Sequence, residues 1–363
     1  MKKVVLILAA AAAVAACAKN EVITDFANGE NEITFNVAPK TKALGTNQSD
    51  FDHNNVFKAS AFYLGKDKTW ANDALEATLY IAESEISYNS DVWKNATTSY
   101  YWPKDGGSLT FLAFSYNKND LELAQETETP SNFSIEKPTI GQDGKLHYGV
   151  NGAIDVIANK NVDFLVADIA ADKTGNDKTY DHNGVPTLFK HKLSQVVFNA
   201  KVDQDYADKT FEINEITFEN LPFYGMYNQF PETMTVGTDN AKAANQSYAK
   251  DVAQVVTTTN TKVDAKVKGE NTADTDGQYL YVPQAFTNTN RELVIKYTVT
   301  TVVAGSTPVV ENCEARLKIE DKFASWEMGK RYIFNIKFGL NEITWDPAVE
   351  GWEDVNTSEI TIE

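Results

Sequence analysis

Short stretches in which apolar and polar residues alternate recur along this chain, and they constrain its fold more than any other feature. Residues Glu32–Val37 alternate with a period of two, and the same period returns at Val196–Val202 and Phe211–Phe218. Because successive side chains of a β-strand point to opposite faces, this period predicts strands with one buried face. Amphipathic helical patterns are scarce, with Leu121–Glu126 and Ala241–Val256 as candidates. The sequence therefore predicts an all-β protein.

The N-terminus has the composition of an export signal. Two lysines precede an apolar run from Val4 to Val14, and small residues lead from there to Cys17. The run is too short for a membrane-spanning helix and predicts a signal peptide over residues 1–16. Its end resembles a bacterial lipobox, which implies that Cys17 is acylated and is followed by a tether over residues 17–31. An ordinary secretory signal that happens to be cut beside a cysteine is the alternative.

The net charge narrows the range of partners. The chain has 51 acidic and 33 basic residues, which give a formal net charge of -18. Such a surface repels phosphate backbones and anionic lipid head groups, so nucleic acid is excluded as an expected partner. Membrane attachment would then depend on the lipid at Cys17. Once that residue is acylated, Cys313 is the sole remaining cysteine, and no intramolecular disulfide is expected.

A turn-rich stretch divides the chain into two predicted domains. The length of 363 residues exceeds the usual size of one domain. Residues 172–186 are rich in Asp, Asn, Gly and Lys, and they contain an Asn-Gly turn signal. The predicted domains are accordingly 32–185 and 186–363. The polar segment 239–277 is interpreted as a long surface insert.

The sequence contains no constellation typical of an enzyme. Its four histidines have no metal-ligand spacing, so we expect neither a metal site nor a catalytic one. Phosphate-binding loops and nucleophile motifs are absent from the sequence as well, and no cofactor is expected. His191, which lies between two lysines, is interpreted as a structural histidine in a strand. The six tryptophans would suit sugar stacking, but packing in the core or at a sheet edge is the favoured interpretation.

One five-residue pattern recurs from the start to the end of the chain. Asn-Glu-Ile-Thr-Phe occupies 31–35 and 214–218, Asn-Glu-Ile-Thr-Trp occupies 341–345, and Ser-Glu-Ile-Thr-Ile occupies 358–362. In a strand, the isoleucine and the large apolar residue two positions later face the same side and would fill neighbouring pockets of one groove. The first and last copies would thus fit the same groove, although short strands also coincide by chance.

A set of further motifs spans nearly the whole mature chain in a fixed order. After the lipobox these are Tyr100–Pro103 with Leu109–Phe114, then Asp163–Ala167, Phe189–Ser194, Tyr281–Gln284, Trp326–Tyr332, Ile343–Trp345 and Trp352. With these motifs the chain resembles the fimbrillins, the lipoprotein pilins of type V pili and their cell-surface relatives. The resemblance implies an all-β fold with two tandem transthyretin-like β-sandwich domains after a lipoprotein signal peptide.

The resemblance also implies a mechanism of assembly. A lipid-anchored precursor reaches the outer membrane and cell surface, a protease cuts it, and its first strand leaves. A C-terminal strand of another fimbrial subunit then fills the opened groove. In this chain the removed strand would carry Ile33, Phe35 and Val37, and the cut would fall between Lys42 and Ala43. The candidate donor residues are Ile343, Trp345, Ile360 and Ile362.

A second interpretation uses the same fold without polymerisation. In it, the chain is a monomeric surface lipoprotein that binds a glycan or another ligand on a host or bacterial surface. Two positions depart from the family pattern and leave room for it. Lysine stands at the expected cut, where pilins of this family usually have arginine, and a single acid, Glu21, closely follows Cys17.

Overall fold

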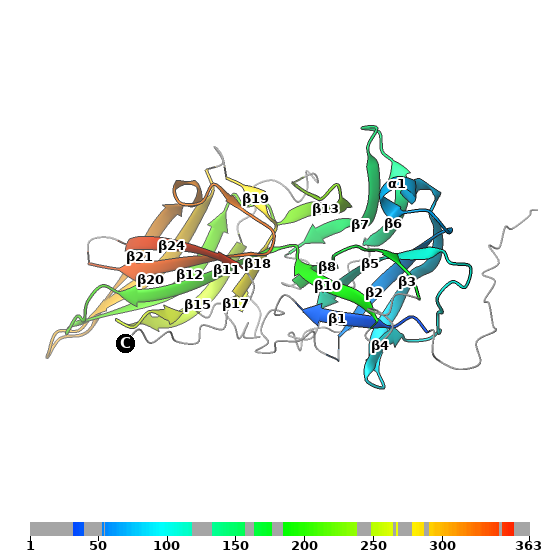
Figure 1. Ribbon diagram of the computed structural model, residues 1–363. Helices are drawn as coiled ribbons and strands as arrows, with labels where there is room; N and C mark the ends of the chain where they lie inside the picture. Colours follow the sequence, from blue (N-terminus) through cyan, green and yellow to red (C-terminus); the bar gives the residue numbers. More distant parts are fainter. Residues whose placement is uncertain are drawn as a thin grey trace, which may run out of the picture.

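The computed structural model confirms the all-β prediction (Figure 1). It describes residues 32–39, 53, 55–117, 133–156, 163–175, 184–237, 248–263, 266–267, 278–286, 290–340 and 343–351. The described helices are single turns, namely α1 (Trp70–Asp73), η1 (Ala74–Glu76) and η2 (Ile319–Asp321). No helix in the described part of the chain is long and apolar enough to cross a membrane. The molecule is elongated, with two bodies of strands placed end to end.

The first body is built on a sheet that closes on itself. Its strands are β1 (Phe35–Pro39), β2 (Val56–Leu64), β3 (Thr78–Asn89), β4 (Val92–Asn95), β5 (Ser108–Asn117), β8 (Asp163–Ala167), β9 (Ala170–Lys173) and β10 (Val185–His191). Seven of them follow the order β2-β3-β4-β1-β10-β8-β5, and β5 pairs again with β2. The closed sheet has a core of its own, to which each of these seven strands contributes.

A second, four-stranded sheet packs against the outside of the closed sheet. It has the order β14-β13-β7-β6 and consists of β6 (Ser134–Ile140), β7 (Leu146–Asp155), β13 (Tyr224–Phe230) and β14 (Thr233–Val236). Phe133, beside β6, packs on Phe164 of β8 with ring centroids 4.4 Å apart. The hairpin β13–β14 therefore joins residues from after the predicted domain boundary to a sheet of the first body.

The second body is a sandwich of two sheets. One contains β11 (Ser194–Val202), β16 (Thr261–Lys262), β18 (Gln278–Tyr281), β23 (Lys330–Phe338) and β24 (Ile343–Gly351). The other has the order β17-β15-β12-β20-β21 and consists of β12 (Lys209–Glu219), β15 (Tyr248–Val256), β17 (Lys266–Val267), β20 (Glu292–Thr301) and β21 (Val309–Lys318). A small pair, β19 (Gln284–Ala285) and β22 (Ser325–Trp326), completes it.

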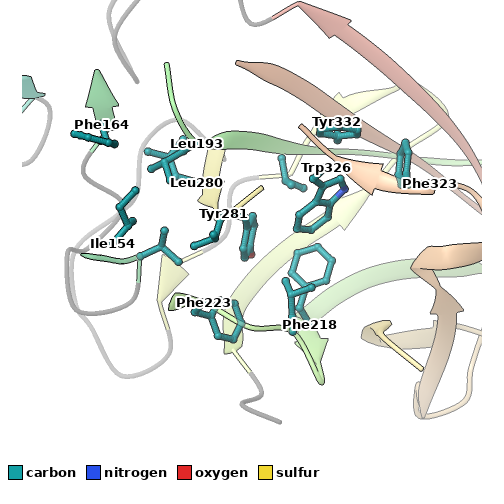
Figure 2. Close-up of a cluster of buried hydrophobic side chains, with 14 of the residues drawn as sticks. Ile154, Phe164, Leu193, Phe218, Phe223, Leu280, Tyr281, Phe323, Trp326 and Tyr332 are labelled. Carbon is teal, nitrogen blue, oxygen red and sulfur yellow. The ribbon is translucent and has the colours of Figure 1, made fainter. Parts of the chain in front are cut away.

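Apolar packing is continuous between the two bodies. Figure 2 shows this cluster, which runs from Phe164 through Leu193 and Leu280 to Trp326 and Phe323. All five side chains are buried. The bodies therefore share one hydrophobic core in addition to the separate core of the closed sheet.

Two expectations about the segment 239–277 need correction. The candidate helix over 241–256 is wrong for its described part, because residues 248–256 form strand β15, which pairs with β12. The insert is also more regular than a surface excursion, since it supplies β15, β16 and β17. Tertiary pairing outweighs a weak helical pattern here, because Val252 and Val256 are buried in the sandwich core. The other candidate helix, 121–126, lies outside the described residues.

Candidate strand-exchange site

Strand β1 fills the gap between β4 and β10 and thereby closes the first sheet (Figure 1). It pairs in parallel with β10 over five positions, from Phe35 with Val185 to Pro39 with Phe189. On its other side it pairs with β4 at one position, Phe35 with Trp93. We call this gap the β1 site. The strand is therefore held mainly from one side, and without it the sheet would open between β4 and β10.

The inward side chains of this segment enter the core of the closed sheet. Ile33 and Phe35 are 3% and 4% exposed. The Phe35 ring meets Phe57 and Phe111 edge-on, with centroids 5.5 and 5.7 Å away. Val37 is half-buried and packs against the same cluster. An empty β1 site would expose a strongly apolar groove. Filling that groove is favourable, because burial of one such apolar side chain is worth about 1.5–3 kcal/mol.

The residues just before β1 are held to the loop after β4. The Ile33 backbone N–H donates to the Tyr100 carbonyl over 2.7 Å, and Glu32 forms an isolated bridge with Tyr101. The Ser99 hydroxyl donates to the Glu32 carboxylate over 2.6 Å. These contacts place Ile33 and Phe35 on one face, as their spacing of two predicts.

Gly184 permits the close approach between β1 and the start of β10. The Val185 backbone N–H donates to the Thr34 carbonyl over 2.7 Å. Gly184 has φ +80°, and a Cβ at this position would lie 2.7 Å from the carbonyl carbon and oxygen of Thr34. These are backbone atoms that no change of rotamer can move away. A glycine is therefore required for β1 to lie where it does.

Replacing Gly184 by alanine is expected to destabilise the protein more than the same change at Gly144 or Gly305. All three glycines have φ between +74° and +81°, but a Cβ at Gly144 or Gly305 meets nothing within 4 Å. The two controls thus measure the backbone strain alone, about 1–2 kcal/mol. Urea unfolding checks this, and equal losses in all three variants would contradict the role of Gly184.

The two described candidate donor residues lie outside the β1 site. Ile343 and Trp345 belong to β24, which pairs with β23 over nine positions at the edge of the second body. The Trp345 ring stacks on Phe334, with centroids 5.1 Å apart and planes 3° apart. Cys17, Lys42, Ala43, Ile360 and Ile362 lie outside the described residues.

In the described copies of the five-residue pattern, the isoleucine and the aromatic residue point toward an apolar core. Ile33 with Phe35 faces the core of the closed sheet, while Ile216 with Phe218 in β12 is buried in the sandwich. Ile343 with Trp345 packs against that same sandwich core. Each described copy thus presents an isoleucine and an aromatic ring to an apolar core. The copy at 358–362 has the same spacing of apolar residues.

Sequence reasoning missed a buried contact between an aspartate and a histidine at the end of β10. His191 Nδ1 lies 2.6 Å from Asp163 Oδ2, and neither side chain has any exposed surface. The interpretation of His191 as a residue within a strand agrees with its place in β10. Asp163 entered the sequence analysis as the first residue of the motif Asp163–Ala167, and nothing in that motif indicated a contact with His191. The pair joins β10 to β8 where the two bodies meet.

A second polar group lies beside this pair. Lys192 Nζ donates to Glu232 over 2.6 Å, and the Tyr227 hydroxyl donates to the same carboxylate oxygen over 2.9 Å. Burial, together with the charge of Glu232, raises the pKa of Tyr227 above its usual range, so the hydroxyl remains a donor. These contacts connect the β10–β11 junction to the hairpin β13–β14.

Metal-ligand clusters and tryptophan positions can be compared with the sequence expectations. They contain no group of three His, Cys, Asp or Glu side chains that would hold a metal ion. Trp70, Trp93 and Trp326 are buried, and Trp102 and Trp345 are half-buried against the cores. The core-packing interpretation of these five tryptophans is therefore confirmed, and the described residues supply no exposed tryptophan platform for a sugar.

The fold and the site define an all-β protein in which an N-terminal strand completes a closed sheet. A family model described as fimbrillin-like matches residues 41–352, and the chain belongs to this family. A fimbrial protein from Bacteroides vulgatus has a similar structure, with a TM-score of 0.61 and 18% identity over 89% of this chain and 99% of that one. This level of identity supports the fold alone.

A second solved structure has a lower similarity. It is a candidate cell adhesion protein from Bacteroides uniformis, with a TM-score of 0.46 and 14% identity over 90% of this chain and 99% of that one. A comparison with curated protein sequences found no match.

Proposed function

We propose that this chain is a non-enzymatic structural or adhesive subunit of a cell-surface fimbria. Membership of the fimbrillin-like family supports a fimbrial role. The observation that carries the proposal is the way β1 is held, with Ile33 and Phe35 buried in the closed sheet and one pairing position on the β4 side. Such a strand is suited to replacement by an equivalent strand from another subunit.

The proposal includes export as a lipoprotein and removal of the first strand. The chain would be acylated at Cys17, carried to the outer membrane and cell surface, and cut between Lys42 and Ala43. The cut would fall three residues after Pro39, where β1 ends. Cleavage there would sever β1 from the body of the protein on its C-terminal side. The strand would then be held by non-covalent contacts alone.

Strand exchange would follow from the apolar character of the β1 site. An empty site presents unpaired backbone groups on β10 and β4 together with an apolar groove, and such an edge readily accepts a further strand. The donor would be the copy of the pattern at 358–362, with Ile360 and Ile362 as its inward residues. Ile343 and Trp345 would remain in β24, where they support the second body.

The first test is the size of the protein recovered from the cell surface without boiling. We expect a ladder of high-mass species whose subunits begin at Ala43, because exchanged strands resist dissociation in detergent. Intact mass and N-terminal sequencing identify the cut. A single monomer that still begins at acylated Cys17 would contradict the proposal and favour a monomeric surface lipoprotein with a ligand-binding role.

Deletion of Val355–Glu363 separates the same two functions. We expect this variant to lose the ladder completely, because the donor is gone while β24 and the β1 site remain. Its unfolding curve should match that of the full chain, which serves as the control for folding. A ladder that survives the deletion would show that the donor lies elsewhere.

A further inference from the structure

The last described residue, Gly351, lies at the end of the second body that adjoins β10. Strand β24 ends at Gly351, which pairs with Lys330 at the start of β23. The neighbouring Gly329 donates its backbone N–H to the Leu193 carbonyl over 2.9 Å. Leu193 stands two residues after the end of β10. In Figure 1, the red strand β24 accordingly lies in the same sheet as β11, the strand that continues from β10.

The segment after Gly351 is long enough to reach the β1 site. Adjacent strands lie about 4.8 Å apart, so Gly351 is about 10 Å from β11 across β23. Phe189 of β10 pairs with Pro39 and so marks the near end of the β1 site. At about 3.3 Å per residue it is at most about 13 Å from Leu193, and β1 lies one strand spacing away from β10. The distance from Gly351 to the Pro39 end of the site is therefore about 20 Å. Residues 352–363 span up to about 40 Å when extended.

This reach favours entry from the nearer end of the site. A segment that enters at the Pro39 end runs toward Ile33, which makes it antiparallel to β10. Entry in the opposite direction would require the segment to pass the whole site before turning back, which takes up nearly all of its extended length. Within about 40 Å, Ile362 reaches the place of Phe35 and Ile360 the place of Val37. Ile360 and Ile362 are two residues apart, as are Phe35 and Val37. The two isoleucines can therefore face the core in either strand direction, because side chains of a strand alternate with a period of two.

We propose that residues 352–363 occupy the β1 site of their own chain once β1 has left, antiparallel to β10, and so cap the subunit against polymerisation. This inference rests on the proposed function, since it requires release of β1. A tethered strand competes at an effective concentration in the millimolar range, far above a micromolar partner. Self-capping would thus restrict strand exchange to places where subunits are concentrated.

Disulfide trapping in the full-length chain tests this cap. The chain carries a specific protease sequence inserted between Lys42 and Ala43, with serine in place of Cys17 and Cys313. Leu188 pairs with Ala38 and faces away from the groove core. Antiparallel entry places Glu359 opposite Leu188, whereas parallel entry places Glu363 there. Two double variants are therefore compared. Both carry Leu188→Cys, and the second substitution is Glu359→Cys in one and Glu363→Cys in the other. Side chains directly opposite each other on neighbouring strands lie at a separation that suits a disulfide.

We expect an intrachain disulfide in the Glu359→Cys variant after cleavage, with a yield unchanged by tenfold dilution, and none before cleavage. An intrachain disulfide confined to the Glu363→Cys variant would overturn the antiparallel cap. Interchain disulfides that fall with dilution, without an intrachain product, would overturn self-capping while supporting exchange between subunits. No disulfide of either kind after β1 has been released would overturn both the cap and the proposed function.

Discussion

Replacing Phe35 by alanine is expected to lower the free energy of unfolding by about 3–5 kcal/mol, the range observed for buried phenylalanines. The Phe35 ring is 4% exposed and contacts Phe57 and Phe111 in the core of the closed sheet. Its removal leaves a cavity at the one position where β1 also pairs with β4. Urea unfolding of the unprocessed protein measures the loss.

Asn36→Ala is the matched control, because Asn36 lies on the same strand with its side chain exposed. Its change in the free energy of unfolding should stay within about 0.5 kcal/mol. A second readout is digestion by a protease, since β1 should become accessible in the Phe35→Ala variant before the rest of the chain unfolds. Equal stability of the two variants would mean that β1 contributes no buried contacts in solution.

Removal of the Asp163 carboxylate is the second change with a large expected effect. Asp163 and His191 are fully buried and 2.6 Å apart, and loss of a buried polar contact of this kind costs about 1–3 kcal/mol. The cost arises because the remaining group stays buried without its counterpart. Since His191 ends β10, we expect Asp163→Ala to weaken the β1 site as well as the junction between the bodies. Urea unfolding and protease accessibility of β1 measure both effects.

An exposed ion pair on the same strands gives the control. Lys190 of β10 contacts Asp168, just after β8, over 2.6 Å, with both side chains nearly half exposed. Asp168→Ala should cost less than about 1 kcal/mol, as is usual for surface pairs. A double-mutant cycle with His191→Ala isolates the coupling within the buried pair. A loss at Asp163 no larger than that at Asp168 would contradict the account.

The period-two alternation was sufficient to predict strands and their inward residues. Ile33 with Phe35 and Ile216 with Phe218 face apolar cores, as their spacing indicates. Such a prediction succeeds because side-chain direction in a strand is a local property of the backbone. The partner of each strand is not local, so the parallel pairing of β1 with β10, 150 residues later, carried no sequence signal.

The helix prediction for residues 248–256 was wrong for the same physical reason. Residues 248–256 looked like part of a helix because their apolar residues are compatible with both periods, and the pairing with β12 decides for a strand. Gly184 belongs to the turn signal predicted at the domain boundary, and the structure adds that it makes room for the Thr34 backbone. The Asp163–His191 pair joins groups 28 positions apart, which no local pattern could indicate.

The sequence by itself determined the all-β class, the inward faces of the strands and the family likeness, because these depend on local residue types in order. The tertiary structure alone decided that β1 closes a sheet between β4 and β10, and that β24 lies two strands from β11, with its last residue near the start of that strand. These features depend on which distant backbone groups pair, and that choice is made by the packing of the whole chain.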